Sequence, residues 1–278
     1  MVRNLTFMDS RSPHNVVIYT WEEYEGRKSP NEVGTCILKY IKDHVPDNIE
    51  HLIFWSDSAP GQNKNFHVPT AMFRSLQDKN NLKLIDHKFP VVGHTHLEVD
   101  SVHAAVEREV HKRRVSVTSD WLDVFRSCRL QNPYIIQQMK HTDFLDFTNK
   151  SYLKKAQSEI KISHQYWLRY EKNTTYLQMK TALSDPHFKR VELKLGNPLP
   201  TLPLTPAYAN QLLVSAQKKI DQLEYIRNGA IPYAYLNMVR EIPSSLSPDA
   251  EQKIVDKLKV VYTINIIDDG DKDKIKNS

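Results

Sequence analysis

The chain has 278 residues, of which 40% are hydrophobic and 26% charged, and a net charge of +5. This is the composition of a globular protein of about two domains, and 7 glycines exclude glycine-rich low complexity. No apolar run could span a membrane, and the first residues contain no secretory signal. The two cysteines, Cys36 and Cys128, suit a reducing compartment, and we expect the nucleus rather than the cytoplasm.

Strand-like and helix-like segments alternate over residues 1–125. Strands are predicted at 15–21, 51–55 and 82–89, and helices at 29–45, 66–77 and 99–114. Ser29 is the expected N-cap, with Pro30 at the first helical position and Glu32 completing a capping box. The continuous apolar run at 51–55 predicts a central strand of a parallel sheet, buried on both faces. This alternation indicates an α/β core with a mixed sheet flanked by helices.

The pattern changes after residue 125. Residues 126–195 are predicted to form an α+β extension, with strands at 162–170 and 188–195 and a helix near 142–154. Four prolines within 197–206 predict an extended strap, followed by a helix at 208–227 that ends at Gly229 and Pro232. We expect 196–267 to pack back onto the core and the charged residues 268–278 to be disordered.

The turn after the second strand carries the densest polar sequence, IFWSDSAPGQNKN at 53–65. In open α/β sheets, catalytic and binding groups lie at the carboxyl ends of strands, where Asp57 is expected. Asn63 and Asn65 offer donors and acceptors nearby, and Lys64 is a cation suited to phosphate. The alternative is that Asp57 caps the next helix or forms an Asx-turn.

A second polar segment is GHTHLEVDSVHAAVEREVHKRR at 93–114. Helical spacing places Asp100 and Glu107 on one face, shared with His103 or Ala104 and with His111. Such carboxylates favour Mg²⁺ or Mn²⁺, whereas a solvated helix face is the alternative. Zinc is disfavoured because HExxH and CxxC are absent, and ATP and NAD because no nucleotide-binding glycine pattern occurs.

Basic and aromatic residues are interleaved between 154 and 194. The basic set is Lys154, Lys155, Lys161, Arg169, Lys172, Lys180, Lys189, Arg190 and Lys194, and the aromatic set is Tyr166, Trp167, Tyr170 and Tyr176. This combination is typical of nucleic-acid surfaces, in which bases stack on rings and phosphates meet cations. The alternative is that the rings belong to the core and the charges are solvated.

Several motifs together carry a family resemblance. They are TWEEYEGRKSPNEVGTCILKYI at 20–41, LIFWSDSAPGQNKN at 52–65, KFPVVGHTHLEVDSVHAAVE at 88–107 and the closing segment 202–239. They resemble an uncharacterised domain family of animal genomes, whose members show an "SDN-GQNKN" turn followed by a "GHS/T…D…E" segment. That family looks like a transposase-derived domain with an RNase H-like core.

The resemblance implies metal-dependent phosphodiester cleavage or strand transfer on DNA or RNA, in which acidic residues hold two Mg²⁺ or Mn²⁺ ions. Asp57 matches the acid after the fourth strand, and Asp100 or Glu107 the helix acid. His94 would orient a metal ligand or carry a proton, and His96 would join the metal site. Asn63, Lys64 and Asn65, with the basic cluster Lys112, Arg113 and Arg114, would contact nucleic acid.

The sequence departs from the family pattern at its first acid, which would lie on a strand before LTFMDSR unless Asp9 substitutes for it. Ser58 also replaces the usual Asn of the turn, and Arg27-Lys28 the usual Arg-Gly. Because two carboxylates cannot hold two ions, we expect impaired catalysis and weak binding of a single ion. The alternative function is a catalytically inactive module that binds nucleic acid or protein.

Overall fold

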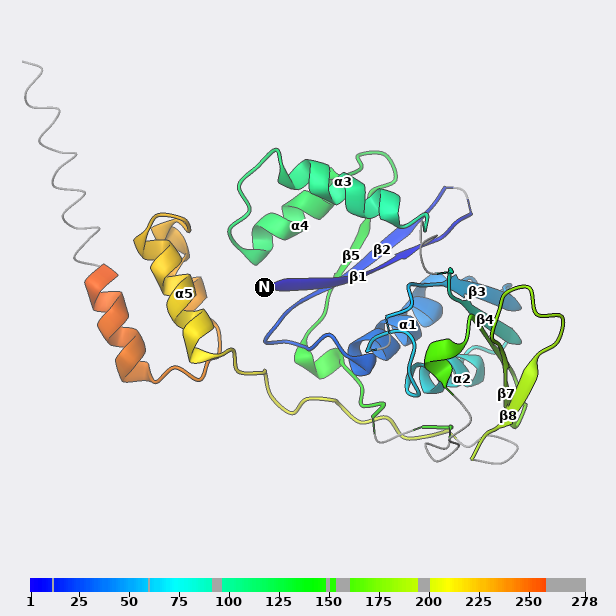
Figure 1. Ribbon diagram of the computed structural model, residues 1–278. Helices are drawn as coiled ribbons and strands as arrows, with labels where there is room; N and C mark the ends of the chain where they lie inside the picture. Colours follow the sequence, from blue (N-terminus) through cyan, green and yellow to red (C-terminus); the bar gives the residue numbers. More distant parts are fainter. Residues whose placement is uncertain are drawn as a thin grey trace, which may run out of the picture.

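The computed structural model describes residues 1–11, 13–59, 61–91, 97–148, 151–153, 161–194 and 201–258. These residues form an α/β fold with two mixed sheets flanked by helices, which confirms the expected fold class. The sheets have the strand orders β1-β2-β5 and β3-β4-β6-β7-β8. Figure 1 shows both sheets around helix α1, with a separate helical group on the far side of the N-terminus.

The three-stranded sheet is centred on β2 (Val16–Glu22), which pairs antiparallel with β1 (Val2–Met8) and parallel with β5 (Ile135–Gln138). Alternate residues of β2 face two different cores. Val17, Tyr19 and Trp21 join the main core with α1 (Pro30–His44), whereas Val16 and Ile18 pack with Val102 of α3 (Asp100–Val110) and Phe125 of α4 (Thr118–Ser127). The strand buried on both faces is therefore β2.

The five-stranded sheet has one core face and one open face. Its strands are β3 (His51–Trp55), β4 (Leu84–Lys88), β6 (Trp167–Glu171), β7 (Tyr176–Lys180) and β8 (Lys189–Glu192). Strands β3 and β4 are parallel, and the later pairs are antiparallel. The core face packs with α1 and with α2 (Val68–Asp78), through residues such as Ile85, Leu168 and Tyr170.

The expectation of a central, fully buried strand at 52–55 is wrong. Strand β3 lies at the edge of the five-stranded sheet, and the side chains of Ile53 and Trp55 are 46% and 48% exposed. An apolar run indicates a strand but does not show whether both of its edges and faces are covered. This placement also removes one feature on which the RNase H-like interpretation depended.

The start of α1 agrees with the sequence. Ser29 is the N-cap and shares a capping box with Glu32, whose carboxylate accepts hydrogen bonds from the Ser29 N–H (3.0 Å) and hydroxyl (2.5 Å). The N–H of Arg27 also donates to Glu32 (2.8 Å), as does the hydroxyl of Tyr208 (2.5 Å). The fully buried Glu32 therefore joins the first helix to the distant segment around Tyr208.

Other predicted boundaries need correction. Pro69 lies in the first turn of α2, where no N–H donor is needed, so it does not weaken that helix. Residues 208–215 are not helical, and α5 (Ala216–Arg227) begins after the N-cap Ser215. In place of the helix at 142–154 there is only the short 3₁₀ segment His141–Asp143 before non-helical residues, among the part described. Strands β1, β5 and β7 and helix α4 were not predicted.

The C-terminal helices form a small core of their own. Leu223 and Ile226 of α5 pack with α6 (Leu236–Glu241) and with Val255 and Leu258 of the helix at 248–258. Gly229 has a φ of +71°, which only glycine adopts easily, and it ends α5 as expected. Among the described helices, none has the length and apolar character needed to cross a membrane. Residues 268–278, expected to be disordered, lie outside the described part.

Candidate functional site

The turn after β3 presents Asp57 to solvent. Its carboxylate accepts a hydrogen bond from the side-chain amide of Asn63, so the two residues fix each other across the turn. The N–H groups of Gln62, Asn63 and Lys64 all donate to the carbonyl of Ala59. This arrangement keeps Asp57 exposed at the carboxyl end of a strand, as the sequence predicted.

Lys64 and Asn65 do not face the solvent as expected of nucleic-acid ligands. Lys64 is only 5% exposed, and its ammonium lies 4.7 Å from the ring centroids of both Phe89 and Tyr166. Burial lowers the pKa of Lys64. The side-chain oxygen of Asn65 accepts hydrogen bonds from the N–H groups of His67 and Val68 and so caps α2. Both placements go against phosphate contacts by these two residues.

A buried histidine lies directly behind this turn. The Nε2 atom of His87 is 2.8 Å from the hydroxyl of Ser56, and its Nδ1 is buried without a hydrogen-bond partner among the described residues. Burial lowers the pKa of His87 to about 3, so the imidazole is neutral at physiological pH. Because no acidic group among the described residues orients the ring, the pair lacks the third member of a catalytic triad in that part of the chain.

Helix α3 holds the other expected acids. The carboxylate of Asp100 accepts a hydrogen bond from the N–H of Leu97 (2.9 Å), so it caps its own turn. Glu107 is exposed seven residues farther along, which is about 10 Å along the helix axis. Asp100 is therefore the acid nearer to the start of the helix, and Glu107 is not beside it.

The basic cluster after α3 is already engaged. Lys112 and Arg113 both bind the carboxylate of Glu109, at 2.5 Å and 3.0 Å. These interactions lower the pKa of Glu109. Arg114 donates to the carbonyls of Gly229 and Ala230 and so tethers this segment to the C-terminal helices. Arg114 therefore has a structural role here, whereas Lys112 and Arg113 stay exposed.

The described residues do not assemble a metal centre. Within them, no group of three or more His, Cys, Asp or Glu side chains could hold an ion. His94 and His96, expected beside the metal, lie outside the described residues. These residues therefore fit a two-ion site poorly. The carboxylates of Asp57 and Asp100 instead each accept a hydrogen bond from a residue of their own turn.

A cavity of about 810 Å³ lies between the two sheets. Residues 5–11, in β1 and the turn after it, line one side of the cavity, and residues 51–56, in β3 and just after it, line another. Side chains of α1 also line it. Asn63 of the turn and Leu97–Val99 before α3 also border this space. The cavity thus brings together the segments that precede Asp100 and surround Asp57.

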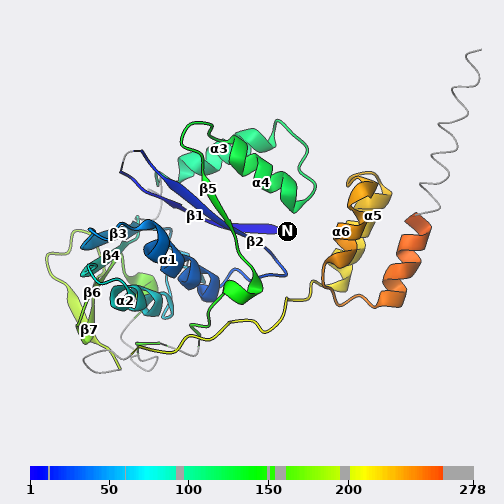
Figure 2. The same cartoon turned by 180° about the vertical axis from the view of Figure 1, so that it is seen from behind.

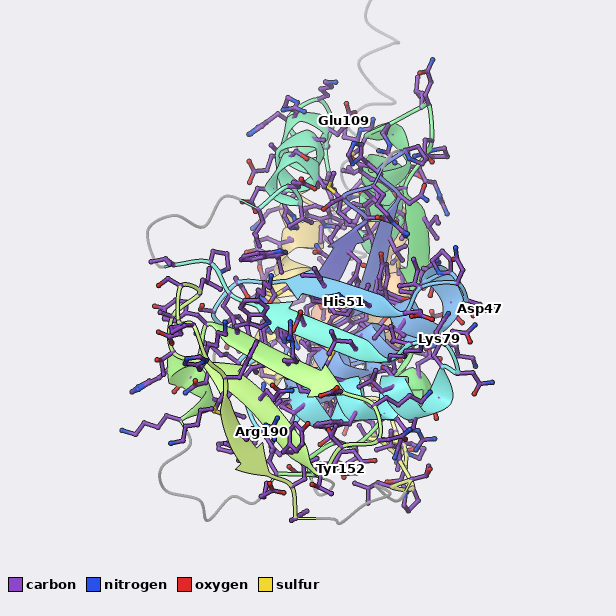
Figure 3. The ribbon with its side chains drawn as sticks, turned by 90° about the vertical axis from the view of Figure 1, so that its right-hand side faces the viewer. Asp47, His51, Lys79, Glu109, Tyr152 and Arg190 are labelled. Carbon is purple, nitrogen blue, oxygen red and sulfur yellow. The ribbon has the colours of Figure 1, made fainter. Side chains whose placement is uncertain are left out.

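The open face of the five-stranded sheet carries rings and cations in register. One row crosses the strands through Trp55, Lys88, Trp167 and Lys180. The ammonium of Lys88 is 4.0 Å from the ring centroid of Trp167 and 5.6 Å from that of Trp55. Figure 3 is seen from the side of this sheet, with His51 on β3 and Arg190 on β8 marking opposite edges.

The adjacent row is organised by the buried carboxylate of Asp86. It accepts hydrogen bonds from the Trp167 indole (2.7 Å) and from two nitrogens of Arg169 (2.8 and 2.9 Å), and His51 lies 2.9 Å from it. Burial raises the pKa of Asp86, but the hydrogen bonds from Arg169, Trp167 and His51 outweigh burial and lower it. The carboxylate thus compensates Arg169 and fixes Trp167. The same face also carries Lys88 and the exposed Arg190, together with the acidic side chains of Glu171 and Glu192.

A protein-family model described as a domain of unknown function, DUF7869, matches residues 9–185 of the sequence. The chain belongs to this family. The match contains the turn, α3 and most of the five-stranded sheet, but it ends before 202–239, which the sequence also assigned to the resemblance. No curated protein and no solved structure matches the chain.

Sequence reasoning missed the parts that depend on strand pairing. Trp55 was read as a buried strand residue, and Asp86 was not singled out at all. The sequence signal that could have found them is the alternation of side chains between the two faces of each strand. In β3 this alternation puts His51, Ile53 and Trp55 on one face. The pairing of these strands, which the structure supplies, turns separate residues into one surface.

Proposed function

We propose that this domain binds single-stranded nucleic acid through the open face of its five-stranded sheet. The observation that carries the proposal is Trp55, a half-exposed indole at the sheet edge in register with Lys88 and Trp167. Bases stack on exposed rings without regard to sequence, and neighbouring cations meet the phosphates. This corresponds to the catalytically inactive binding module, with nucleic acid rather than protein as the ligand.

The arrangement of charge supports a backbone contact beside the stacked base. Arg190 is exposed at the far edge of the sheet, and its guanidinium lies 4.5 Å from the ring centroid of Tyr176. A strand of nucleic acid that stacks on Trp55 and crosses the sheet would meet Lys88 first and Arg190 last. Such contacts make affinity fall as salt rises.

The test is fluorescence anisotropy with labelled oligothymidine and oligouridine of about 12 nucleotides. We expect Trp55→Ala to weaken binding about tenfold, because a single stacked base contributes roughly 1–3 kcal/mol. Ile53→Ala is the matched control, since Ile53 is equally exposed two residues away, and we expect less than about a twofold change. Arg190→Ala should reduce the salt slope by about one. Absence of binding at low salt, or equal affinity for Trp55→Ala, would contradict the proposal.

Metal-dependent phosphodiester cleavage or strand transfer, with a transposase ancestry, is the second candidate. The observation in its favour is that the exposed Asp57 follows β3 while its neighbours share a cavity with the start of α3. Because the described residues hold no complete metal group, we expect one weakly bound Mn²⁺ and weaker Mg²⁺.

Calorimetric titration with Mn²⁺ tests this candidate. Binding should be lost in Asp57→Ala and retained in Asp78→Ala, whose carboxylate is exposed on α2 and paired with Arg74. Cleavage of single-stranded and nicked DNA should stay at background. Robust Mg²⁺-dependent cleavage would show an active enzyme, and Mn²⁺ binding unchanged in Asp57→Ala would remove the site.

A further inference from the structure

The two sheets end at facing strand edges. Strand β1 pairs only with β2, and β3 pairs only with β4, so each has one edge without a partner strand among the described residues. The cavity between the sheets is lined by consecutive residues of both strands, Leu5–Met8 and His51–Trp55, rather than by alternate ones. Successive side chains of a strand point to opposite faces of its sheet. Because consecutive residues line the cavity, each strand turns its edge toward it, with the free N–H and C=O groups of that edge.

The floor of this space is apolar and continuous beneath both strands. The rings of Phe7 on β1 and Phe54 on β3 have centroids 6.2 Å apart, and both contact the ring of Tyr40 on α1. Val33 and Ile37 of α1 extend the floor. A ligand lying here would cover an apolar floor while two rows of backbone groups flank it.

An extended polypeptide segment is the ligand that fits both features. Only an extended backbone offers hydrogen-bond donors and acceptors on two opposite sides, so that it can pair with β1 and β3 at once. Its inward side chains would pack on Phe7, Tyr40 and Phe54.

The chain contains one segment of this chemistry outside its described part. Twenty residues, 259–278, follow the last described helix, and 260–267 read VVYTINII. Six of these eight residues are Val, Ile or Thr, the β-branched types that favour strands. The acidic and basic residues from 268 onward would end such a strand.

The helix that precedes the segment belongs to the C-terminal core and does not line the cavity. The helix at 248–258 is held in the C-terminal core through Val255 and Leu258, and that core lies beside Met1 and Glu23. Figures 1 and 2 agree that this helix and β3 lie on opposite sides of the N-terminus. The segment begins two residues after 258, so about 7 Å of chain joins it to that helix.

We propose that residues 260–267 of a second copy of the chain insert between β1 and β3 and join the two sheets into one. The contact is head-to-tail, because the groove of one copy takes the tail of the next. Association therefore depends on concentration and gives rings or open chains of copies.

Mass measurement and hydrogen exchange on the full chain test this proposal together. We expect copies of the chain to associate at high concentration. Amide hydrogen exchange in both β1 and β3 should then be about tenfold slower than in the monomer. The double variant Ile264→Pro/Ile266→Pro should be monomeric with fast exchange at both edges, because proline cannot donate to a strand. Lys272→Pro/Lys274→Pro is the matched control outside the segment and should behave as the unaltered chain.

A synthetic peptide of residues 259–269, added to the Ile264→Pro/Ile266→Pro variant, should restore slow exchange at both edges. The same peptide carrying the two prolines should not. The proposal is overturned if the full chain is monomeric with freely exchanging edges, or if protection is limited to one strand. A monomer whose edges are protected until the prolines are introduced would also overturn it, because the tail would then fill its own groove.

Discussion

Burial in the fold opposes the protonation of His87. The folded chain keeps its imidazole neutral down to pH 3 or so, whereas the unfolded chain takes up a proton near pH 6.5. Between these values the unfolded state binds more protons, so the free energy of unfolding decreases as the pH falls from 6.5. Protonation therefore opposes folding at mildly acidic pH.

Urea unfolding at pH 7, 6 and 5 measures this effect. We expect the contribution of His87 to approach about 1.4 kcal/mol per pH unit below pH 6. His87→Gln should flatten the dependence, whereas His103→Gln on the exposed side of α3 should leave it unchanged. A parallel pH dependence in both variants would show that His87 is not buried and neutral.

Asp86 is the residue that holds the open face of the sheet in order. Its carboxylate is 1% exposed, and removal of its charge leaves the Arg169 guanidinium without its partner. We expect Asp86→Asn to lower the free energy of unfolding by about 3 kcal/mol, measured with urea at pH 7. Asp78→Asn, which removes the exposed partner of Arg74, should cost less than about 0.5 kcal/mol. Similar costs for both would contradict a buried network.

The same carboxylate adds a pH dependence of its own. Because its pKa in the folded chain is lower than 3.8, its contribution to stability is complete above that pH and is lost as the pH falls further. Asp86→Asn should lack this loss. Asp86 thus contributes to the loss of stability below pH 3.8, whereas His87 contributes to the decline that begins near pH 6.5.

At the scale of elements, the start of α1 is fixed by local chemistry. The Ser29 hydroxyl and the Glu32 carboxylate satisfy each other's neighbouring N–H groups. We expect Ser29→Ala to lower the free energy of unfolding by about 1 kcal/mol in urea unfolding. Ser119→Ala, at an exposed position in α4, should change it by less than about 0.5 kcal/mol. An unchanged stability for Ser29→Ala would show that the cap is dispensable.

Local signals explain which elements could be predicted. Some signals depend on only a few neighbouring residues: the N-cap at Ser29, the helix end at Gly229 and the apolar run of β3. The structure contains the helix start, the helix end and the strand that these signals predict. The edge position of β3 was not predictable in this way, because it depends on which distant strand pairs with it. Strand β7 could not be predicted either, because its polar and apolar residues alternate over only five positions, which is a weak local signal.

At the scale of the whole molecule, the candidate site shows the same division. Asp57 could be placed from the sequence because strand ends in α/β sheets are predictable. The row of Trp55, Lys88, Trp167 and Lys180 could not, since it joins four strands in a register that only the folded chain defines. The basic cluster after α3 likewise acquires its role from Arg114, which contacts Gly229 far along the chain.

The whole molecule therefore offers two rival surfaces to a nucleic acid. One is the open sheet face with Trp55 and Arg190, and the other is the exposed end of α3 with Lys112 and Arg113. Figure 3 places Glu109, the partner of these two cations, well apart from His51 on the sheet. A measurement that locates bound nucleic acid separates the two.

Ultraviolet crosslinking of the full chain to a labelled oligothymidine, followed by mass spectrometry of the peptides, is the most direct measurement. The account predicts that crosslinks concentrate on the peptide that contains Trp55, because its exposed ring stacks on bases. Those crosslinks should be absent at position 55 in Trp55→Ala. Crosslinks confined to the peptide with Lys112 and Arg113, or none on the sheet face, would contradict the central claim.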